Sequence, residues 1–221
     1  MGQLSGSGAI FLSAGVPDPD AKHFMGEGDS AAITAAVSAL LYVALGRRRL
    51  VWGGHPAITP MVWSVAEAMN VDYSGWVRLY QTLAFKDDFP EETAKFQNVV
   101  FTEAVGSDIP LSLEVMRKKM IGDTSFDVAV FIGGMAGIME EYELIRASAC
   151  PVKIIPLAST GGAALSLHQQ VQADPELEEE LDYVSLFHKQ LEIDPNERRY
   201  RTPSEQPVEI ADRITVPFSR E

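Results

Sequence analysis

The chain has 221 residues, of which 46% are hydrophobic and 22% are charged; this is the composition of an ordinary globular domain and excludes the disordered and fibrous classes. Its 18 basic and 31 acidic side chains give a net charge of −13. Such a charge argues against a nucleic acid bound through phosphate neutralisation and against docking on an anionic membrane.

Short apolar runs alternate with longer amphipathic runs along the first 172 residues. In chain order, the pattern predicts a strand over 9–15, a helix over 31–45, a strand over 50–52, a helix over 59–69, and strands over 76–82 and 98–103. It continues with a helix over 109–122, a strand over 126–132, a helix over 136–149, a strand over 152–157 and a helix over 159–172. Nearly continuous apolar strands that alternate with helices are typical of a parallel sheet buried on both faces. We therefore expect an α/β fold, a Rossmann-like parallel sheet flanked by helices on both faces.

The last fifty residues have a different composition. Positions 172–221 carry 13 acidic and 6 basic residues, which is −7 of the total charge of −13. Residues 175–193 predict one amphipathic helix with an apolar face formed by Leu177, Leu181, Val184, Leu186 and Phe187. Beyond Pro195 the chain is rich in proline and charge. We divide the chain into a main domain over 1–172 and an acidic C-terminal helix and extended tail over 173–221, which either packs on the domain or forms an arm for a partner.

Several classes of protein are excluded by what the sequence lacks. No run of 18 apolar residues predicts a membrane span, and the first fifteen residues have no positive charge typical of a signal peptide, so a cytoplasmic protein is expected. The single cysteine, Cys150, excludes an internal disulfide, and we expect it to be a small apolar core residue. The four histidines show no ligand spacing with cysteine or carboxylates, so we expect neither a metal nor a cofactor.

Four of the predicted strands end in glycine or other small residues. In an open parallel sheet, ligands bind outside the carboxyl ends of the strands, and the helix that follows each strand presents free N–H groups to an anion. These junctions supply the ligand-binding candidates Ser13, Ala14, Gly15, Gly53, Gly54, His55, Gly133, Gly134, Met135, Gly137, Ser159 and Thr160. Together they predict a cleft that binds a phosphate or a ribose, although glycines also serve simply to make tight turns.

Two further observations refine this cleft. The chain has neither the P-loop pattern nor a G-x-G-x-x-G after its first strand, which excludes the usual nucleoside triphosphatase and dinucleotide fingerprints. Glu103 ends a predicted strand at the same edge, where a carboxylate suits a ribose diol, or it is simply a solvated strand-end group. His55, in its loop, is either a hydrogen-bonding group for the ligand or a surface residue.

The stretch from Glu114 to Ile145 resembles the SLOG superfamily, which joins LOG-type cytokinin-activating phosphoribohydrolases, the DNA-processing protein DprA and the N-terminal region of TRPM channels. LOG members carry an R-K pair on a helix and then P-G-G-x-G-T-x-x-E after a strand. Here the pair is Arg117-Lys118, and the second motif is matched by Gly133-Gly134, Gly137 and Glu141. Ile132 and Ile138 replace the proline and the threonine, and one extra residue precedes Gly137. The openings IFLSAGVPDP and VWGGHPAITPMV also resemble a bacterial branch linked to antiviral signalling.

This resemblance implies a chemistry for two side chains. In LOG-type enzymes, the matching arginine and glutamate act on the N-glycosidic bond between a base and ribose 5′-phosphate, so Glu141 and Arg117 become the catalytic candidates. A carboxylate near C1′ stabilises developing positive charge, and the amides of Gly133 and Gly134 would hold the phosphate. Compensation of helix dipoles accounts for the same charges without any catalysis.

Three functions remain open. The first is a nucleotide-binding protein that recognises an adenine- or NAD-derived nucleotide, as a sensor or effector in bacterial antiviral signalling. The second is a nucleotide N-glycosidase or phosphoribohydrolase, and the third is a non-catalytic subunit that binds another protein. The resemblance also implies a homodimer or higher oligomer, for which Met135, Ile138, Met139 and Tyr142 would supply an apolar contact unless they belong to the core.

Overall fold

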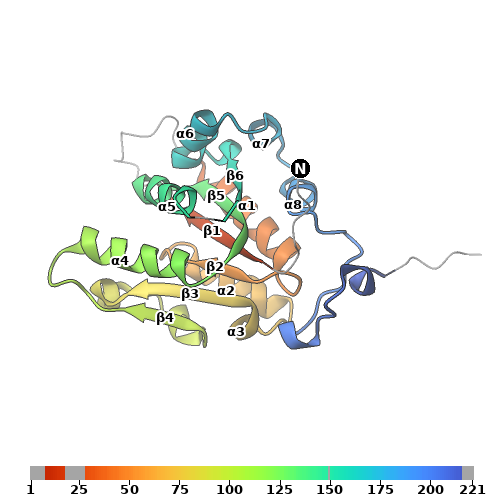
Figure 1. Ribbon diagram of the computed structural model, residues 1–221, viewed down its shortest axis with the longest axis horizontal. Helices are drawn as coiled ribbons and strands as arrows, with labels where there is room; N and C mark the ends of the chain where they lie inside the picture. Colours follow the sequence, from red (N-terminus) through yellow and green to blue (C-terminus); the bar gives the residue numbers. More distant parts are fainter. Residues whose placement is uncertain (1–7, 18–27, 149, 216–221) are drawn as a thin grey trace, which may run out of the picture.

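One six-stranded sheet organises the chain, as a computed structural model describes it over residues 8–17, 28–148 and 150–215 (Figure 1). The strands are β1 (Ala9–Gly15), β2 (Leu50–Trp52), β3 (Val77–Thr82), β4 (Val99–Thr102), β5 (Phe126–Gly133) and β6 (Lys153–Leu157). They pair in the order β4-β3-β2-β1-β5-β6, and every pair is parallel. The α/β Rossmann-like fold expected from the sequence is confirmed. Because the chain leaves β1 toward β2 and leaves β5 toward β6, the topological switch point lies between β1 and β5.

Helices cover both faces of the sheet, and alternate strand residues point to different helices. One face packs on α1 (Ser30–Ala44), α2 (Thr59–Ala68), α7 (Glu176–Glu179) and α8 (Tyr183–Gln190). The other face packs on α4 (Ile109–Gly122), α5 (Ala136–Arg146) and α6 (Gly162–Val171). The remaining short elements are α3 (Tyr73–Trp76), η1 (Leu83–Asp88), η2 (Glu91–Lys95), η3 (Ala158–Thr160), η4 (Pro203–Glu205) and η5 (Ile210–Arg213).

Capping side chains set the beginnings of two of the longer helices. Asp29 accepts hydrogen bonds from the N–H groups of Ala31 and Ala32 at the start of α1. Asp108 does the same for Leu111 at the start of α4, where Pro110 occupies the first turn and lacks only an N–H that has no partner in the helix. The helix expected over 59–69 begins at Thr59 without a side-chain cap, because its N-cap residue, Ile58, has no polar side chain. The Thr59 hydroxyl donates instead to the carbonyl of His55.

The single amphipathic helix expected over 175–193 is wrong. The chain forms two short helices instead, because Glu180 is extended after α7 and Asp182 caps α8 by accepting from the N–H of Ser185. Leu177, Leu186 and Phe187 are buried, as the pattern requires, whereas Leu181 is 68% exposed and Val184 is 36% exposed. The predicted apolar face therefore holds for three of its five members.

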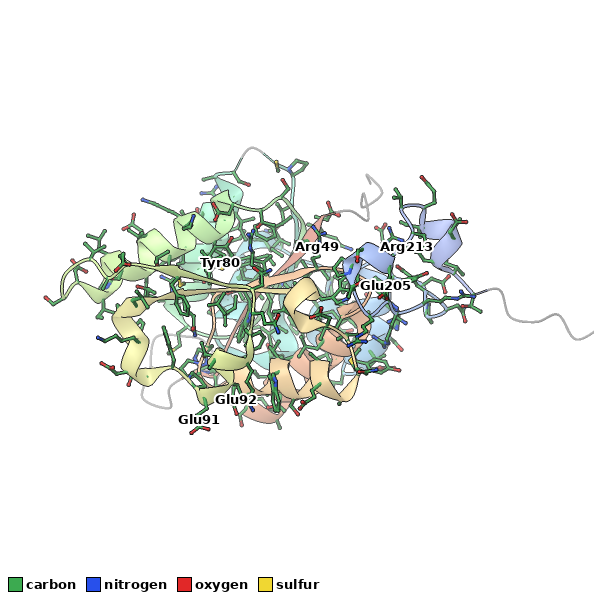
Figure 2. All side chains as sticks on the ribbon, turned by 90° about the horizontal axis from the view of Figure 1, so that it is seen from below. Arg49, Tyr80, Glu91, Glu92, Glu205 and Arg213 are labelled. Atoms are coloured by element: carbon green, nitrogen blue, oxygen red, sulfur yellow. The ribbon has the colours of Figure 1, made fainter. Side chains whose placement is uncertain are left out.

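The segment after α8 is anchored by buried charge. Arg48, at the end of the turn after α1, makes two hydrogen bonds of 2.6 and 3.1 Å to the carboxylate of Glu197, whose side chain is fully buried. Arg213 approaches the same carboxylate at 3.7 Å, and Arg47 donates to the carbonyl of Glu197 at 2.7 Å. The segment packs beside α3, and Figure 2 labels Glu205 and Arg213 on it.

The structure bears on several further expectations from the sequence. Cys150 is exposed rather than buried, because it lies in the turn before β6 and not in the strand. Ile138 and Tyr142 belong to the core between α5 and the sheet, so core packing accounts for them. The expectation about the N-terminus concerns residues that include 1–7, which lie outside the described ones. Within the described part, no helix combines the length and the apolar character that a membrane span requires.

Candidate functional site

A cavity of about 510 Å³ opens at the carboxyl ends of β1, β2 and β3, beside the start of α5. The volume lies within the range of small-molecule sites. The two strands at the switch point contribute Gly15, the last residue of β1, and Gly134, the residue after β5, to its wall. The connection between β3 and β4 contributes Phe85, Phe89 and Pro90. The cavity thus occupies the place where an open parallel sheet binds its ligands.

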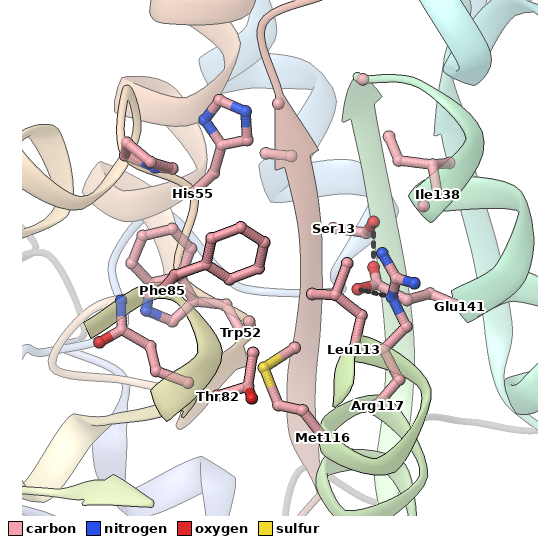
Figure 3. A pocket seen from close by; sticks show the side chains of 18 of the residues that line it. Ser13, Trp52, His55, Thr82, Phe85, Leu113, Met116, Arg117, Ile138 and Glu141 are labelled. Atoms are coloured by element: carbon pink, nitrogen blue, oxygen red, sulfur yellow. Dashed lines mark hydrogen bonds and ion pairs between the residues drawn. The ribbon is translucent and has the colours of Figure 1, made fainter. Parts of the chain in front are cut away.

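One wall carries a buried carboxylate held by two side chains from different elements. Ser13 of β1 donates to Glu141 Oε2 at 2.5 Å, and Arg117 Nε of α4 lies 3.4 Å from Glu141 Oε1 (Figure 3). Arg117 also pairs with Glu140, which is exposed. Burial raises the pKa of the Glu141 carboxyl, while the Ser13 hydrogen bond and the Arg117 charge act in the opposite direction. The cluster joins two carboxylates to one guanidinium, so it has no surplus positive charge.

The start of α5 lies beside this cluster. A Cβ on Gly137 would stand 2.5 Å from Arg117 Nη2, so the guanidinium lies directly against the first turn of the helix. The N–H groups of Ala136 and Gly137 have no acceptor within the helix, and the helix dipole makes this end positive. The helix N-terminus favours an anionic group in the cavity, whereas the charge of Arg117 is already balanced by Glu140 and Glu141.

The double glycine differs from what the sequence led us to expect. The N–H of Gly134 donates to the carbonyl of Gly15 at 2.7 Å, and the N–H of Gly133 donates to the Thr160 hydroxyl at 2.9 Å. Both N–H groups therefore already donate hydrogen bonds within the protein and are not available to a phosphate. Gly133 has φ +58°, and a Cβ there would stand 2.7 Å from the Gly15 carbonyl, so the motif serves the close contact of β1 with β5.

His55 lies across the cavity from the carboxylate (Figure 3). Its Nδ1 accepts a hydrogen bond from the N–H of Ala57 at 3.2 Å, so Nε2 carries the proton in the neutral ring. Burial lowers the pKa of the imidazole and so favours this neutral form. A Cβ on Gly15 would stand 3.4 Å from Nε2, which places this donor beside the β1–β5 junction.

The wall on the His55 side is mainly aromatic, and Gln81, Thr82 and Asp88 are its polar members. Trp52 and Phe85 line it together with Phe89, and Figure 3 shows Trp52 and Phe85 on one side of β1 and the cluster of Ser13, Arg117 and Glu141 on the other. Phe89 also stacks on Phe101 of the edge strand β4, with ring centroids 6.0 Å apart. The cavity therefore has one charged wall and one aromatic wall.

Most of the sequence-predicted residues meet in this cavity. Those that line it are Ser13, Ala14, Gly15, Gly53, Gly54, His55, Arg117, Gly134, Met135, Gly137 and Glu141. Four others do not line it. Glu103 is exposed after the edge strand, Gly133 and Thr160 are buried in the β5–η3 contact, and the Ser159 hydroxyl accepts from Tyr183 at 3.2 Å.

Sequence reasoning missed half of the wall. The missed lining residues include Trp52, Gln81, Thr82, Phe85, Phe89, Leu113 and Met116. Gln81 and Thr82 end β3, so the rule that selected the other strand ends could have found them. The aromatic residues of η1 and the segment after it follow no periodic pattern. Among the described residues, no group of three or more His, Cys, Asp or Glu side chains could hold a metal ion.

Comparison with known proteins gives three results. The model of the SLOG cluster3 family matches residues 23–191 and so covers more than half of the chain. No curated protein matches the chain. Among solved structures, the chain is similar to the X-ray structure of TM1055, a structural genomics target, with 19% identity and a TM-score of 0.42 over 73% of this chain and 81% of that chain.

Proposed function

The chain belongs to the SLOG cluster3 family, and from this premise and the geometry of the cavity we propose that it binds an adenine- or NAD-derived nucleotide. The observation that carries the proposal is the division of one cavity at the switch point into a charged wall and an aromatic wall. A nucleotide has the same division, between its sugar phosphate and its base.

The two walls define an orientation for the ligand. The phosphate lies against the first turn of α5, where the helix dipole attracts an anion and Arg117 Nη2 lies beside the helix as a hydrogen-bond donor. The ribose lies beside Ser13 and Glu141, since a carboxyl group accepts from hydroxyl groups. The base lies against Trp52 and Phe85, because planar rings stack favourably on aromatic side chains.

A thermal-shift experiment tests this function. AMP, ATP, NAD, ADP-ribose and cyclic ADP-ribose are each added to the full chain at increasing concentration. A ligand at 100 times its Kd stabilises the protein by about 2.7 kcal/mol, which is roughly 5–11 °C for a domain of this size. A melting temperature unchanged by every member of the panel would refute nucleotide binding.

A second function, N-glycosidic hydrolysis, is favoured by the buried Glu141 carboxyl. In the proposed orientation this group lies beside the ribose, where it stabilises positive charge at C1′, and Arg117 positions the phosphate. Incubation with AMP and NAD followed by chromatography measures release of the base. Release that disappears in Glu141→Ala supports an enzyme, and no release from any nucleotide that the protein binds assigns the cavity to sensing alone.

The wider role stays a prediction. A sensor or effector in bacterial antiviral signalling is what the family resemblance implies, and a homodimer or higher oligomer belongs to the same prediction. A subunit that only binds other proteins would leave the cavity without a ligand. Light scattering measures the assembly directly, and a monomeric mass would remove the oligomer from the proposal.

A further inference from the structure

Two residues that line the cavity each carry a buried side-chain atom with no hydrogen-bond partner among the described residues. The atoms are the indole Nε1 of Trp52 and the carboxamide Oε1 of Gln81, and both are shielded from solvent. Trp52 is 1% exposed and Gln81 is 4% exposed, and both residues line the cavity. A buried polar atom without a partner is costly to the protein. Of the seven such side-chain atoms among the described residues, only these two belong to residues that line the cavity.

The sheet brings these two side chains to one place. Trp52, the last residue of β2, is in register with Leu79 of β3, and Gln81 lies two residues further along β3. Since alternate residues of a strand share a face, Gln81 projects on the same side of the sheet as Trp52. At the end of β2, a Cβ on Gly54 would stand 2.8 Å from Gln81 Nε2, so the absence of a side chain at Gly54 provides the space in which the carboxamide lies.

We propose that Trp52 and Gln81 form a base-reading pair: the indole N–H donates to an acceptor on the ligand, and the Gln81 oxygen accepts from an N–H donor beside it. This inference rests on the proposed function and specifies the chemistry of the base. Both atoms are shielded from solvent, so rotation of the two side chains must turn them toward the cavity when a planar ring binds against the aromatic wall formed by Trp52 and Phe85 (Figure 3).

The pair defines the ligand by its hydrogen-bonding edge. The base must carry a donor next to an acceptor, as adenine does with its exocyclic amino group and the ring nitrogen on either side of it. A purine without the amino group cannot satisfy the Gln81 oxygen. A site built to hydrogen-bond a ligand group discriminates strongly against the analogue that lacks it, because its own buried groups are then left unpaired.

Calorimetry with modified nucleotides tests the Gln81 half of the pair. AMP is compared with purine riboside 5′-monophosphate, which lacks the amino group, in the wild type and in Gln81→Met, a change that keeps the length of the side chain and removes its polar atoms. We expect the wild type to bind the analogue at least fivefold more weakly than AMP, the order of one buried hydrogen bond, and Gln81→Met to bind the two alike. Gln169→Met, on the exposed side of α6, should behave as the wild type.

The stability of the ligand-free protein provides the second measurement. Because Gln81→Met removes an unpaired buried oxygen, its melting temperature should equal or exceed that of the wild type while its affinity for AMP falls.

Deaza analogues of AMP test the Trp52 half of the pair. One of 1-deaza-AMP and 7-deaza-AMP, each without one ring acceptor, should bind at least fivefold more weakly than AMP. Equal discrimination by the wild type and Gln81→Met, or no loss with either deaza analogue, would overturn the inference while nucleotide binding stands. Failure of the wild type to bind any probe would overturn both.

Discussion

Replacement of Glu197 by glutamine tests whether the C-terminal segment is part of the folding unit. The Glu197 carboxylate is fully buried between Arg48, at 2.6 Å, and Arg213, at 3.7 Å, and both arginine side chains are only 7% exposed. Glutamine keeps the shape of the side chain but removes its charge. Two guanidinium groups then remain in the interior without a neutralising anion, which is the costly way to break a buried ion pair.

The expected loss is about 3–5 kcal/mol, the range for removal of one partner from a buried pair. For a domain of this size, that corresponds to a fall in melting temperature of roughly 6–20 °C. Urea unfolding followed by circular dichroism measures the loss. Glu209→Gln, in the same segment but exposed, is the matched control and should stay within about 0.5 kcal/mol of the wild type. If Glu197→Gln differs from this control by less than about 1 kcal/mol, the segment does not stabilise the domain.

Three further predictions concern the site and its surroundings. Burial raises the pKa of Glu141 above its usual 4.5. The protonated carboxyl therefore stabilises the folded state at low pH, and this stability is lost as the pH rises through the pKa of the folded state. The free energy of unfolding of Glu141→Gln relative to the wild type should therefore increase between pH 4.5 and pH 8, and a constant difference across urea titrations in this range would contradict the burial argument. Gly137→Ala should weaken nucleotide affinity in calorimetry, because the new methyl group displaces the flexible guanidinium of Arg117. Stability should not fall, since alanine favours the helix. The control is Gly122→Ala, whose added Cβ contacts nothing, and it should bind the nucleotide as the wild type does. Cys150 should react with a thiol reagent in the native protein as fast as it does in urea, and protection in the native state would show that it is covered.

The strands were predictable because a strand buried on both faces is recognised from its own run of apolar residues. The apolar runs of β1 and β5 read as strands buried on both faces, and the glycines after them mark the turns to the next elements. The prediction of a single helix over 175–193 was wrong because periodicity alone does not detect a helix cap inside an apolar pattern. Asp182 followed three residues later by Ser185 is a capping arrangement that begins a helix, and this local signal could have divided the segment.

The site was predictable only where the chain itself places residues at strand ends. Gly15, Gly53 and Gly134 meet in the cavity because the carboxyl ends of parallel strands share one edge. The partners of the Gly133 N–H group could not be predicted, since Thr160 reaches it across 27 positions of sequence. Phe85 was missed for the same reason, because only the tertiary fold of the irregular segment after β3 brings its ring to the cavity.

The charges of this acidic chain are not spread evenly, which matters for the proposed binding of an anionic ligand. Arg47 and Arg48 precede β2, so the C-terminal segment that they anchor lies at the amino edge of the sheet, whereas the cavity lies at the carboxyl edge. A strand of seven residues such as β1 spans about 23 Å, and charge is screened over about 8 Å at physiological ionic strength. The acidic groups after residue 194 therefore contribute little to the potential in the cavity, which is set by the groups nearest to it: the start of α5, Arg117, Asp88, Glu140 and Glu141. On this reasoning Glu209→Gln should leave nucleotide affinity unchanged, and a measurable gain in affinity would show that the tail lies close enough to oppose the ligand.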